Sequence, residues 1–182
     1  MTTTAQTNTI SWNIDSSHSE IGFKVRHMMI SNVSGFFERY SLKVETESLD
    51  FTKSKIEFIA DTSSINTDSE QRDAHLKGAD FFDCENFPSL KFEATKVEHL
   101  KDENYLLYGN LTIKEISKEV KLELEFGGIG KDPWGNERAG FNFNGKINRS
   151  DWNLTWNAGL ETGGVLVSDE VKLFGEIELV KA

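Results

Sequence analysis

Val120–Phe126 reads VKLELEF, and this stretch of strict alternation decides the fold class. Its apolar side chains fall on every second residue, with lysine or glutamate between them. Successive side chains of a β-strand point to opposite faces of the sheet. The pattern therefore predicts a strand with one buried face and one face in water.

The same alternation recurs along most of the chain on both sides of this stretch. The further predicted strands lie at about 20–26, 33–47, 55–61, 90–94, 105–113, 139–147 and 167–179. Gly127–Asn136 contains several glycines and Pro133 and is expected to be a loop. Roughly eight strands separated by turns are typical of an all-β sandwich or an up-and-down antiparallel barrel, and such a barrel can enclose one small ligand.

The segment Ile65–Pro88, INTDSEQRDAHLKGADFFDCENFP, departs from the strand pattern. Its run Glu70–Lys77 has no glycine, proline or β-branched residue, follows several good N-cap residues and can end at Gly78. We therefore expect one short helix, followed by the adjacent apolar residues Phe81 and Phe82. Loops of this length inside a domain are commonly lids or binding loops, so this one is expected to cap the mouth of the barrel.

Strand order also predicts which connections lie together, because alternate loops of an up-and-down barrel share an end. One end should carry the connections at 27–32, 65–88, 115–118 and 150–164. The other end should carry those at 49–53, 101–104 and 127–136. The two longest and most aromatic loops thus gather at one mouth, and functional groups are often carried on such loops.

Composition limits the class of protein and of partner. The chain has 182 residues, 37% apolar and 27% charged, as expected for one globular domain. Its net charge of −10 makes nucleic acid an unexpected partner, because a phosphate backbone requires a basic face. Residues 1–10 are expected to be a disordered tail and 11–182 the domain. Neither a membrane-spanning stretch nor a secretory signal is found, so we expect a cytoplasmic location, or a periplasmic one if a leader has been trimmed.

Patterns for catalysis or metal binding are weak. The four histidines lack metal-ligand spacing, and there is no nucleophile elbow or phosphate-binding glycine loop. Cys84 and His75 share one loop and could be a nucleophile and its base, but a structural cysteine is the stronger interpretation. We expect no catalytic residue, no metal and no cofactor.

Apolar side chains on the inward faces are the main remaining feature, with thirteen phenylalanines and four tryptophans in the chain. A packed core and a lined cavity both fit the periodicity, which does not separate them. Gly109, Gly145 and Gly175 lie in the middle of predicted strands. They could allow sharp bends of the barrel wall, or they could leave space for a ligand inside it. The candidate cavity residues are Phe23, Val25, Phe36, Leu42, Phe58, Phe81, Phe82, Phe92, Leu111, Phe126, Phe141, Phe143, Gly145, Trp152, Val171 and Gly175.

Five polar residues are candidates for the predicted mouth: Arg26, His27, Arg72, Asp73 and His75. Arg72 and His75 are about one helical turn apart and would share a face of the predicted helix. Each of the five is more simply a surface charge or a partner in a helix pair. If the cavity holds a lipid, one or two of them would bind its head group.

Several motifs, taken in order, are similar to those of the YceI-like family of lipid-binding barrels. They are WNIDSSHSEIGFKVRH at Trp12–His27, SNVSGFF at Ser31–Phe37, SINT at Ser64–Thr67, RDAHL at Arg72–Leu76, DFFD at Asp80–Asp83, FPSLKF at Phe87–Phe92, GNLTIK at Gly109–Lys114 and RSDW at Arg149–Trp152. Together they make the chain resemble this family from about Trp12 to Leu179.

The resemblance implies a lipocalin-like antiparallel β-barrel with a long internal tunnel, in a protein that could be a homodimer. The tunnel would hold a polyisoprenoid or similar amphiphile, such as a polyprenyl diphosphate, an isoprenoid quinone, a fatty acid or a fatty amide. The implied function is non-catalytic binding, carriage or storage of that lipid. Two alternatives stay open: an enzyme that modifies an isoprenoid lipid through Asp73, His75 or Cys84, and a closed-core structural barrel without a ligand.

Overall fold

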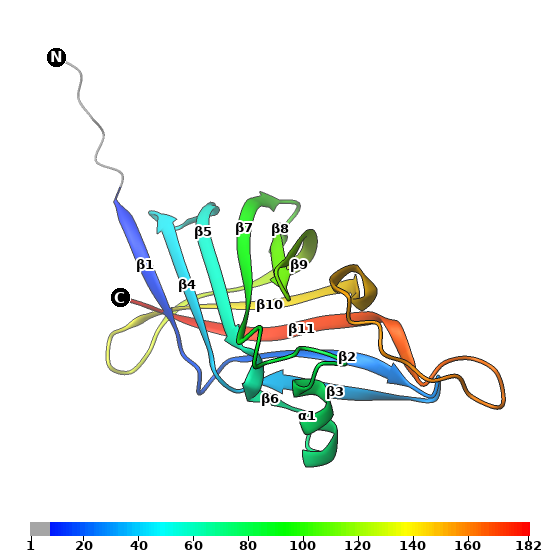
Figure 1. Ribbon diagram of the computed structural model, residues 1–182. Coiled ribbons are helices and arrows are strands. Elements are labelled where there is room, and N and C mark those ends of the chain that lie inside the picture. The colour runs from blue at the N-terminus through cyan, green and yellow to red at the C-terminus, as the bar shows by residue number, and fades with distance from the viewer. Residues whose placement is uncertain (1–7) are drawn as a thin grey trace.

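The computed structural model describes residues 8–182 (Figure 1). The first seven residues of the predicted tail lie outside this range, and Thr9 and Ile10 already belong to the first strand. The strands are β1 (Thr9–Ile14), β2 (Glu20–His27), β3 (Ser31–Phe37), β4 (Tyr40–Glu47), β5 (Asp50–Asp61), β6 (Ile65–Asn66), β7 (Ser89–His99), β8 (Asn104–Ile113), β9 (Ile116–Lys131), β10 (Glu137–Asn148) and β11 (Val167–Lys181). The helical elements are α1 (Glu70–Lys77) and the 3-10 turns η1 (Thr62–Ser64) and η2 (Arg149–Trp152).

The strands close into an antiparallel barrel, as predicted. Hydrogen bonds run in the order β1-β4-β5-β7-β8-β9-β10-β11, and β11 pairs back with β1. β2, β3 and β6 extend the wall beyond β11. Because β1 and β2 both run antiparallel to β11, they form one long strand bent at residues 15–19. β3 and β4 are joined in the same way through a bend at residues 38–39.

β11 changes its partner along its length, and this change opens the barrel at one end. Leu179 pairs with Ile14 of β1, whereas Glu176 pairs with Glu20 of β2. Residues 177–178 of β11 thus lie opposite residues 15–19 of the partner segment. The extra residues on one side bend the wall, as in an exaggerated β-bulge. β1 stays at the closed end, and β2 continues toward the mouth (Figure 1).

An aromatic cluster fills the closed end. Trp12 is 1% exposed, and its indole nitrogen donates a hydrogen bond to Thr46 Oγ1 at 3.1 Å. The ring of Phe51 lies 5.7 Å from that of Trp12, 5.6 Å from Phe126 and 4.9 Å from Phe141, measured between centroids. These contacts bring β1, β5, β9 and β10 together over a shared apolar plug.

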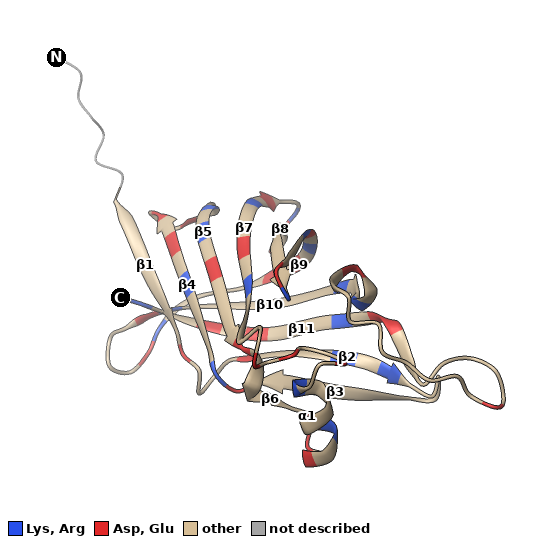
Figure 2. Ribbon diagram, in the orientation of Figure 1, with Lys and Arg blue, Asp and Glu red and all other residues tan. Residues whose placement is uncertain are grey.

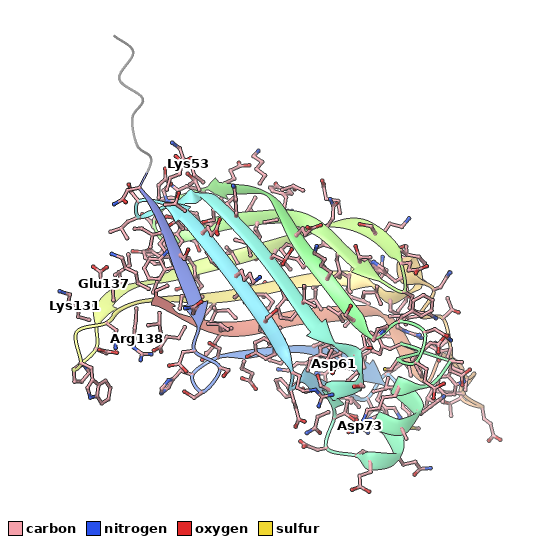
Figure 3. The ribbon with its side chains drawn as sticks, turned by 60° about the vertical axis from the view of Figure 1, so that its left-hand side comes forward. Lys53, Asp61, Asp73, Lys131, Glu137 and Arg138 are labelled. Atoms are coloured by element: carbon pink, nitrogen blue, oxygen red, sulfur yellow. The ribbon has the colours of Figure 1, made fainter. Side chains whose placement is uncertain are left out.

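One guanidinium cross-links the same end from outside. Arg138 of β10 donates through Nε to Asp132 at 2.9 Å, and through Nη1 to Asp15 at 2.7 Å and Glu178 at 2.5 Å. The three carboxylates come from the β9–β10 turn, the β1–β2 bend and β11. Figure 3 shows Arg138 at this end, away from Asp73 beside the helix.

The connections divide between the two ends as predicted. The mouth carries the β2–β3 turn, the 67–88 segment with α1, the β8–β9 turn and the 149–166 loop. Contacts confirm that three of these connections meet: the Met28 amide donates to Leu166 O at 2.8 Å, and the rings of His75 and Trp156 are 4.7 Å apart.

The predicted helix is confirmed with the expected ends. α1 begins after Ser69, whose side chain accepts a bond from the Arg72 amide, and it ends at Gly78. No residue of α1 is buried, so the helix itself sits on the rim. Phe81 and Phe82, which follow it, are 8% and 9% exposed and anchor the loop in the barrel.

The prediction of one continuous strand over 33–47 is wrong at its centre. The bend at residues 38–39 breaks the alternation of inward and outward side chains. The inward-facing residues are odd-numbered before the bend and even-numbered after it. Phe37 is 8% exposed and faces the interior. Phe36 instead packs edge-to-face on Phe174 outside the barrel, with ring centroids 5.8 Å apart.

The predicted loop over 127–136 is shorter than expected, because β9 continues to Lys131. The ladder between β9 and β10 extends past a register shift at Gly140/Phe141. Gly128 adopts a φ of +108° opposite this shift, a conformation that glycine allows at low cost. The glycines that indicated a loop therefore serve a bulge within the sheet.

The mid-strand glycines give room to neighbouring protein atoms. A Cβ on Gly175 would lie 2.3 Å from the Phe143 ring and 2.6 Å from the Glu20 carbonyl oxygen. A Cβ on Gly109 would lie 2.4 Å from the Phe92 ring, and one on Gly145 would lie 2.5 Å from a Leu122 methyl group. Cross-strand side chains therefore fill the space above these glycines.

Gly175→Ala is expected to destabilise the barrel by about 1–3 kcal/mol, because the Glu20 backbone must move. Gly140→Ala is the matched control, since open space surrounds that position and its φ is ordinary. The control should be neutral or slightly stabilising. Urea unfolding of both variants measures the difference, and equal midpoints would contradict the packing argument.

The β2–β3 turn has a large apolar residue at each of its two central positions. Met28 and Met29 have φ values of 51° and 59°, and the Ile30 amide donates to His27 O at 3.0 Å. This is the primed turn that usually carries Asn-Gly. Although its residues are apolar, the tip of this turn is exposed to solvent, and Ile30 is 76% exposed.

Replacing Met28-Met29 with Asn-Gly should raise the free energy of unfolding by about 1 kcal/mol, because left-handed backbone is costly for methionine. Ile30→Ser removes exposed apolar surface without a positive φ and is the control. A higher urea midpoint for the double variant alone is the expected result. An unchanged or lower midpoint for it would contradict this account of the turn.

Candidate functional site

The barrel encloses an elongated cavity of about 790 Å³. That volume lies in the range of roughly 300–1,000 Å³ found for small-ligand sites. The wall begins at the closed end with Leu179 and with Phe51 of the aromatic plug. It ends at His27, His75 and Trp156 among the loops of the mouth. The interior is therefore not filled by protein atoms, as a closed-core barrel would require.

The length of the cavity follows from the residues of β11 that line it. They extend from Val167 to Leu179. At about 3.3 Å per residue this is roughly 40 Å along the strand. A typical strand tilt of about 35–45° reduces the axial length to roughly 30 Å. The cavity is thus about as long as the roughly 30 Å hydrocarbon core of a bilayer is thick.

Most of the predicted apolar residues are brought together on this wall. They are Phe23, Val25, Leu42, Phe58, Phe81, Phe82, Phe92, Leu111, Phe141, Phe143 and Val171. They come from seven strands and from the segment after α1, so closure of the sheet is what assembles them. Lysine, arginine and acidic residues are interspersed along the strands (Figure 2), and most alternate with the lining positions.

The other predicted apolar residues lie off the wall: Phe36, Phe126, Gly145, Trp152 and Gly175. Phe126 belongs to the closed-end plug. Trp152 is 1% exposed and its indole nitrogen donates to Leu111 O at 3.0 Å, so it supports the wall from behind. The two glycines lie beneath neighbouring side chains, and Phe36 is outside the barrel.

Four of the five polar candidates border the cavity at the mouth: Arg26, His27, Arg72 and His75. Arg72 donates from Nε to Thr67 Oγ1 at 2.7 Å and from Nη2 to Thr67 O at 2.6 Å. His75 Nε2 lies 2.9 Å from Asp80 Oδ2. Arg26 donates to Met29 O at 3.2–3.4 Å.

Asp73 does not line the cavity. Its Oδ1 accepts hydrogen bonds from the Thr67 amide at 2.9 Å and from Thr67 Oγ1 at 2.5 Å. The carboxylate therefore fixes the chain at the start of the capping segment. Through the Thr67 hydroxyl it also helps to hold the guanidinium of Arg72.

Arg149 lines the cavity but was not among the predicted site residues. It is 6% exposed, and its guanidinium donates to the carbonyl oxygens of Leu154, Val167 and Ser168. Burial lowers the pKa of this guanidinium from its usual value. An arginine at the start of a single 3-10 turn has no periodicity to indicate burial, and the RSDW motif was its only signal.

The candidate catalytic groups Asp73, His75 and Cys84 form no hydrogen bonds with one another in the described part of the chain. Cys84 is half-buried against the apolar core, and no hydrogen bond joins it to His75 within residues 8–182. Asp15, His18 and Glu178 form a close titratable group, but they lie at the closed end, where Arg138 holds the two carboxylates. No helix in the described part of the chain is long and apolar enough to cross a membrane.

Comparison with known proteins agrees with this architecture. A family model for the YceI-like domain matches residues 12–179. A UPF0312 protein of Staphylococcus aureus strain N315 is 38% identical over 165 residues, which cover 90% of this chain and 94% of that protein.

Solved structures give the same result. The Campylobacter jejuni YCEI protein matches with a TM-score of 0.73 at 35% identity, covering 92% of this chain and 96% of that one. Burkholderia cenocepacia BcnA matches at 0.76 and 20% identity, covering 91% and 98%. A polyisoprenoid binding domain from Saccharophagus degradans matches at 0.71 and 13% identity, covering 94% and 98%, and these last two show a shared fold. The chain belongs to the YceI-like family.

Proposed function

We propose that this protein binds and carries or stores one long-chain amphiphile, without chemical change. The elongated apolar cavity of about 790 Å³ is the observation that carries the proposal. The tail would occupy the barrel, and the head would lie at the mouth near His27, Arg72 and His75. The similar fold of a domain described as polyisoprenoid binding supports this assignment.

The hydrophobic effect alone would give substantial affinity. Burying a methylene group contributes roughly 0.8 kcal/mol, so a chain of roughly sixteen carbons gains on the order of 13 kcal/mol. A nanomolar dissociation constant corresponds to about 12 kcal/mol. Ordering the chain and losing its free tumbling offset much of this gain. The tail would therefore supply affinity with little selectivity, and selectivity would depend on cavity length and on the mouth.

The positions of the titratable groups favour carriage over catalysis. His75 Nε2 lies 2.9 Å from Asp80 Oδ2, and Asp73, which is not part of the cavity wall, accepts a hydrogen bond from the Thr67 amide. Cys84 is not part of the wall either. A nucleophile and its base must lie within hydrogen-bond reach of each other. A bound polyprenyl lipid incubated with the protein should accordingly keep its mass.

Leu173→Trp should lower lipid affinity at least tenfold, because the indole would fill the cavity beside β11. Lys172→Trp is the matched control, since it adds the same ring to the outer face of the same strand. Native mass spectrometry of gently purified protein, followed by titration with geranylgeraniol and palmitate, measures occupancy and affinity. Equal binding by both folded variants would contradict the placement of the tail. Absence of binding to any long-chain lipid would overturn the proposed function.

A further inference from the structure

The five arginines of the chain divide into two classes. Arg39 and Arg138 lie outside the cavity, and both form ion pairs with carboxylates. Arg26, Arg72 and Arg149 border the cavity, and none of them has a carboxylate within 4.0 Å in the described part of the chain. Their hydrogen bonds go to carbonyl or hydroxyl oxygens instead.

The composition of the chain makes the lack of carboxylate partners at the three cavity arginines unexpected. The chain has 30 acidic residues and 20 lysines and arginines, so an arginine has many possible partners. The lining residues nevertheless include no aspartate or glutamate among residues 8–182. They do include His27 and His75 beside the three arginines. Among the described residues, three guanidinium groups and no carboxylate therefore line the mouth of a negatively charged protein.

Arg149 carries the argument furthest, because it is buried as well as unpaired. Buried charges in proteins are normally paired with an opposite charge. Its three carbonyl acceptors satisfy hydrogen bonds, but they provide no formal negative charge. The Asp169 carboxylate opposes the lowering of the Arg149 pKa through its charge, but it lies beyond 4.0 Å, and its own hydrogen bonds come from the Ser150 amide and hydroxyl, both at 2.9 Å. An anion entering the mouth would meet a guanidinium that is already desolvated and fixed in place.

Arg26 of β2 and Arg149 of η2 both form hydrogen bonds with Ser168 of β11. The Arg26 amide donates to Ser168 Oγ at 3.1 Å, and Arg149 Nε donates to Ser168 O at 2.9 Å. Arg72 approaches from the capping segment, where Thr67 holds its Nε and Nη2. Because neither bond uses Nη1, this nitrogen retains its N–H groups for a ligand.

We infer that the mouth selects an amphiphile whose head carries a negative charge, a carboxylate or a phosphate, over one with a neutral head. This inference rests on the proposed function, because the head can reach the mouth only if the tail occupies the barrel. Charge-assisted hydrogen bonds from arginine to such oxygens are shorter and stronger than neutral ones. A quinone or an amide would leave the guanidinium charges uncompensated.

The test compares lipids that share a tail and differ in the head. Lipid-free protein at pH 8 is titrated with palmitate and palmitamide, and with geranylgeranyl diphosphate and geranylgeraniol. The anionic member of at least one pair should bind at least roughly tenfold more tightly, as expected for one charge-assisted bond. The pair that shows the preference distinguishes a carboxylate from a phosphate head.

Arg72→Gln should lower the ratio of anionic to neutral lipid affinity several-fold. Arg39→Gln is the matched control, because it removes the same charge from a paired arginine outside the cavity. Equal loss in both variants would assign the preference to net charge and overturn the inference. Arg149→Gln provides a second measurement of the preference if this variant keeps the circular dichroism spectrum of the folded protein. If Arg149→Gln does not fold, Arg72→Gln alone tests the inference.

Equal affinity for charged and neutral heads in both pairs would overturn the anionic assignment while leaving the carrier function intact. Absence of binding to all four lipids would instead overturn the carrier function itself. The two failures are therefore distinguishable within one set of titrations.

Discussion

The pairing of β11 with two different partners is the constraint on which the rest of the structure depends. Where β11 bonds to β1, the barrel closes around the plug of Trp12 and Phe51. Where it bonds to β2, the wall moves outward and the ladder passes through β3 to β6. A single strand thus makes one end of the barrel solid and leaves the other end open to be covered by loops.

This arrangement separates the packing that stabilises the fold from the space available to a ligand. The closed end is packed with aromatic rings, and within the wall Phe92 and Phe143 lie over glycines of neighbouring strands. Burial at these places stabilises the protein without filling the barrel from end to end. The long apolar wall that remains is costly to hydrate, so an apolar chain would be a favourable occupant.

The sequence predicted the fold well because strand alternation is a local property. The alternation of VKLELEF and its equivalents indicated the barrel, and the capping residues around Glu70–Lys77 placed the helix. The bends were not predictable in this way: the break at residues 38–39 reverses parity, so Phe37 faces inward where Phe36 was expected. Glycine is common both in loops and in β-bulges. The glycines near residue 128 therefore indicated a loop where the structure has a bulge. Arg149 was missed because it lies in one 3-10 turn, and its burial depends on the path of the following segment, which has no periodic pattern.

The positions of the chain ends have a practical consequence. β1 begins at Thr9, opposite Glu47, and the Ala182 amide bonds to Ser11 O, so the described chain starts and finishes at the end with the aromatic plug. The loops that cover the opening lie at the far side of the molecule. A fusion partner, a surface tether or an affinity tag joined directly before Thr9 or after Ala182 would therefore lie opposite the entrance, and protein immobilised in this way would present its open end to the solution.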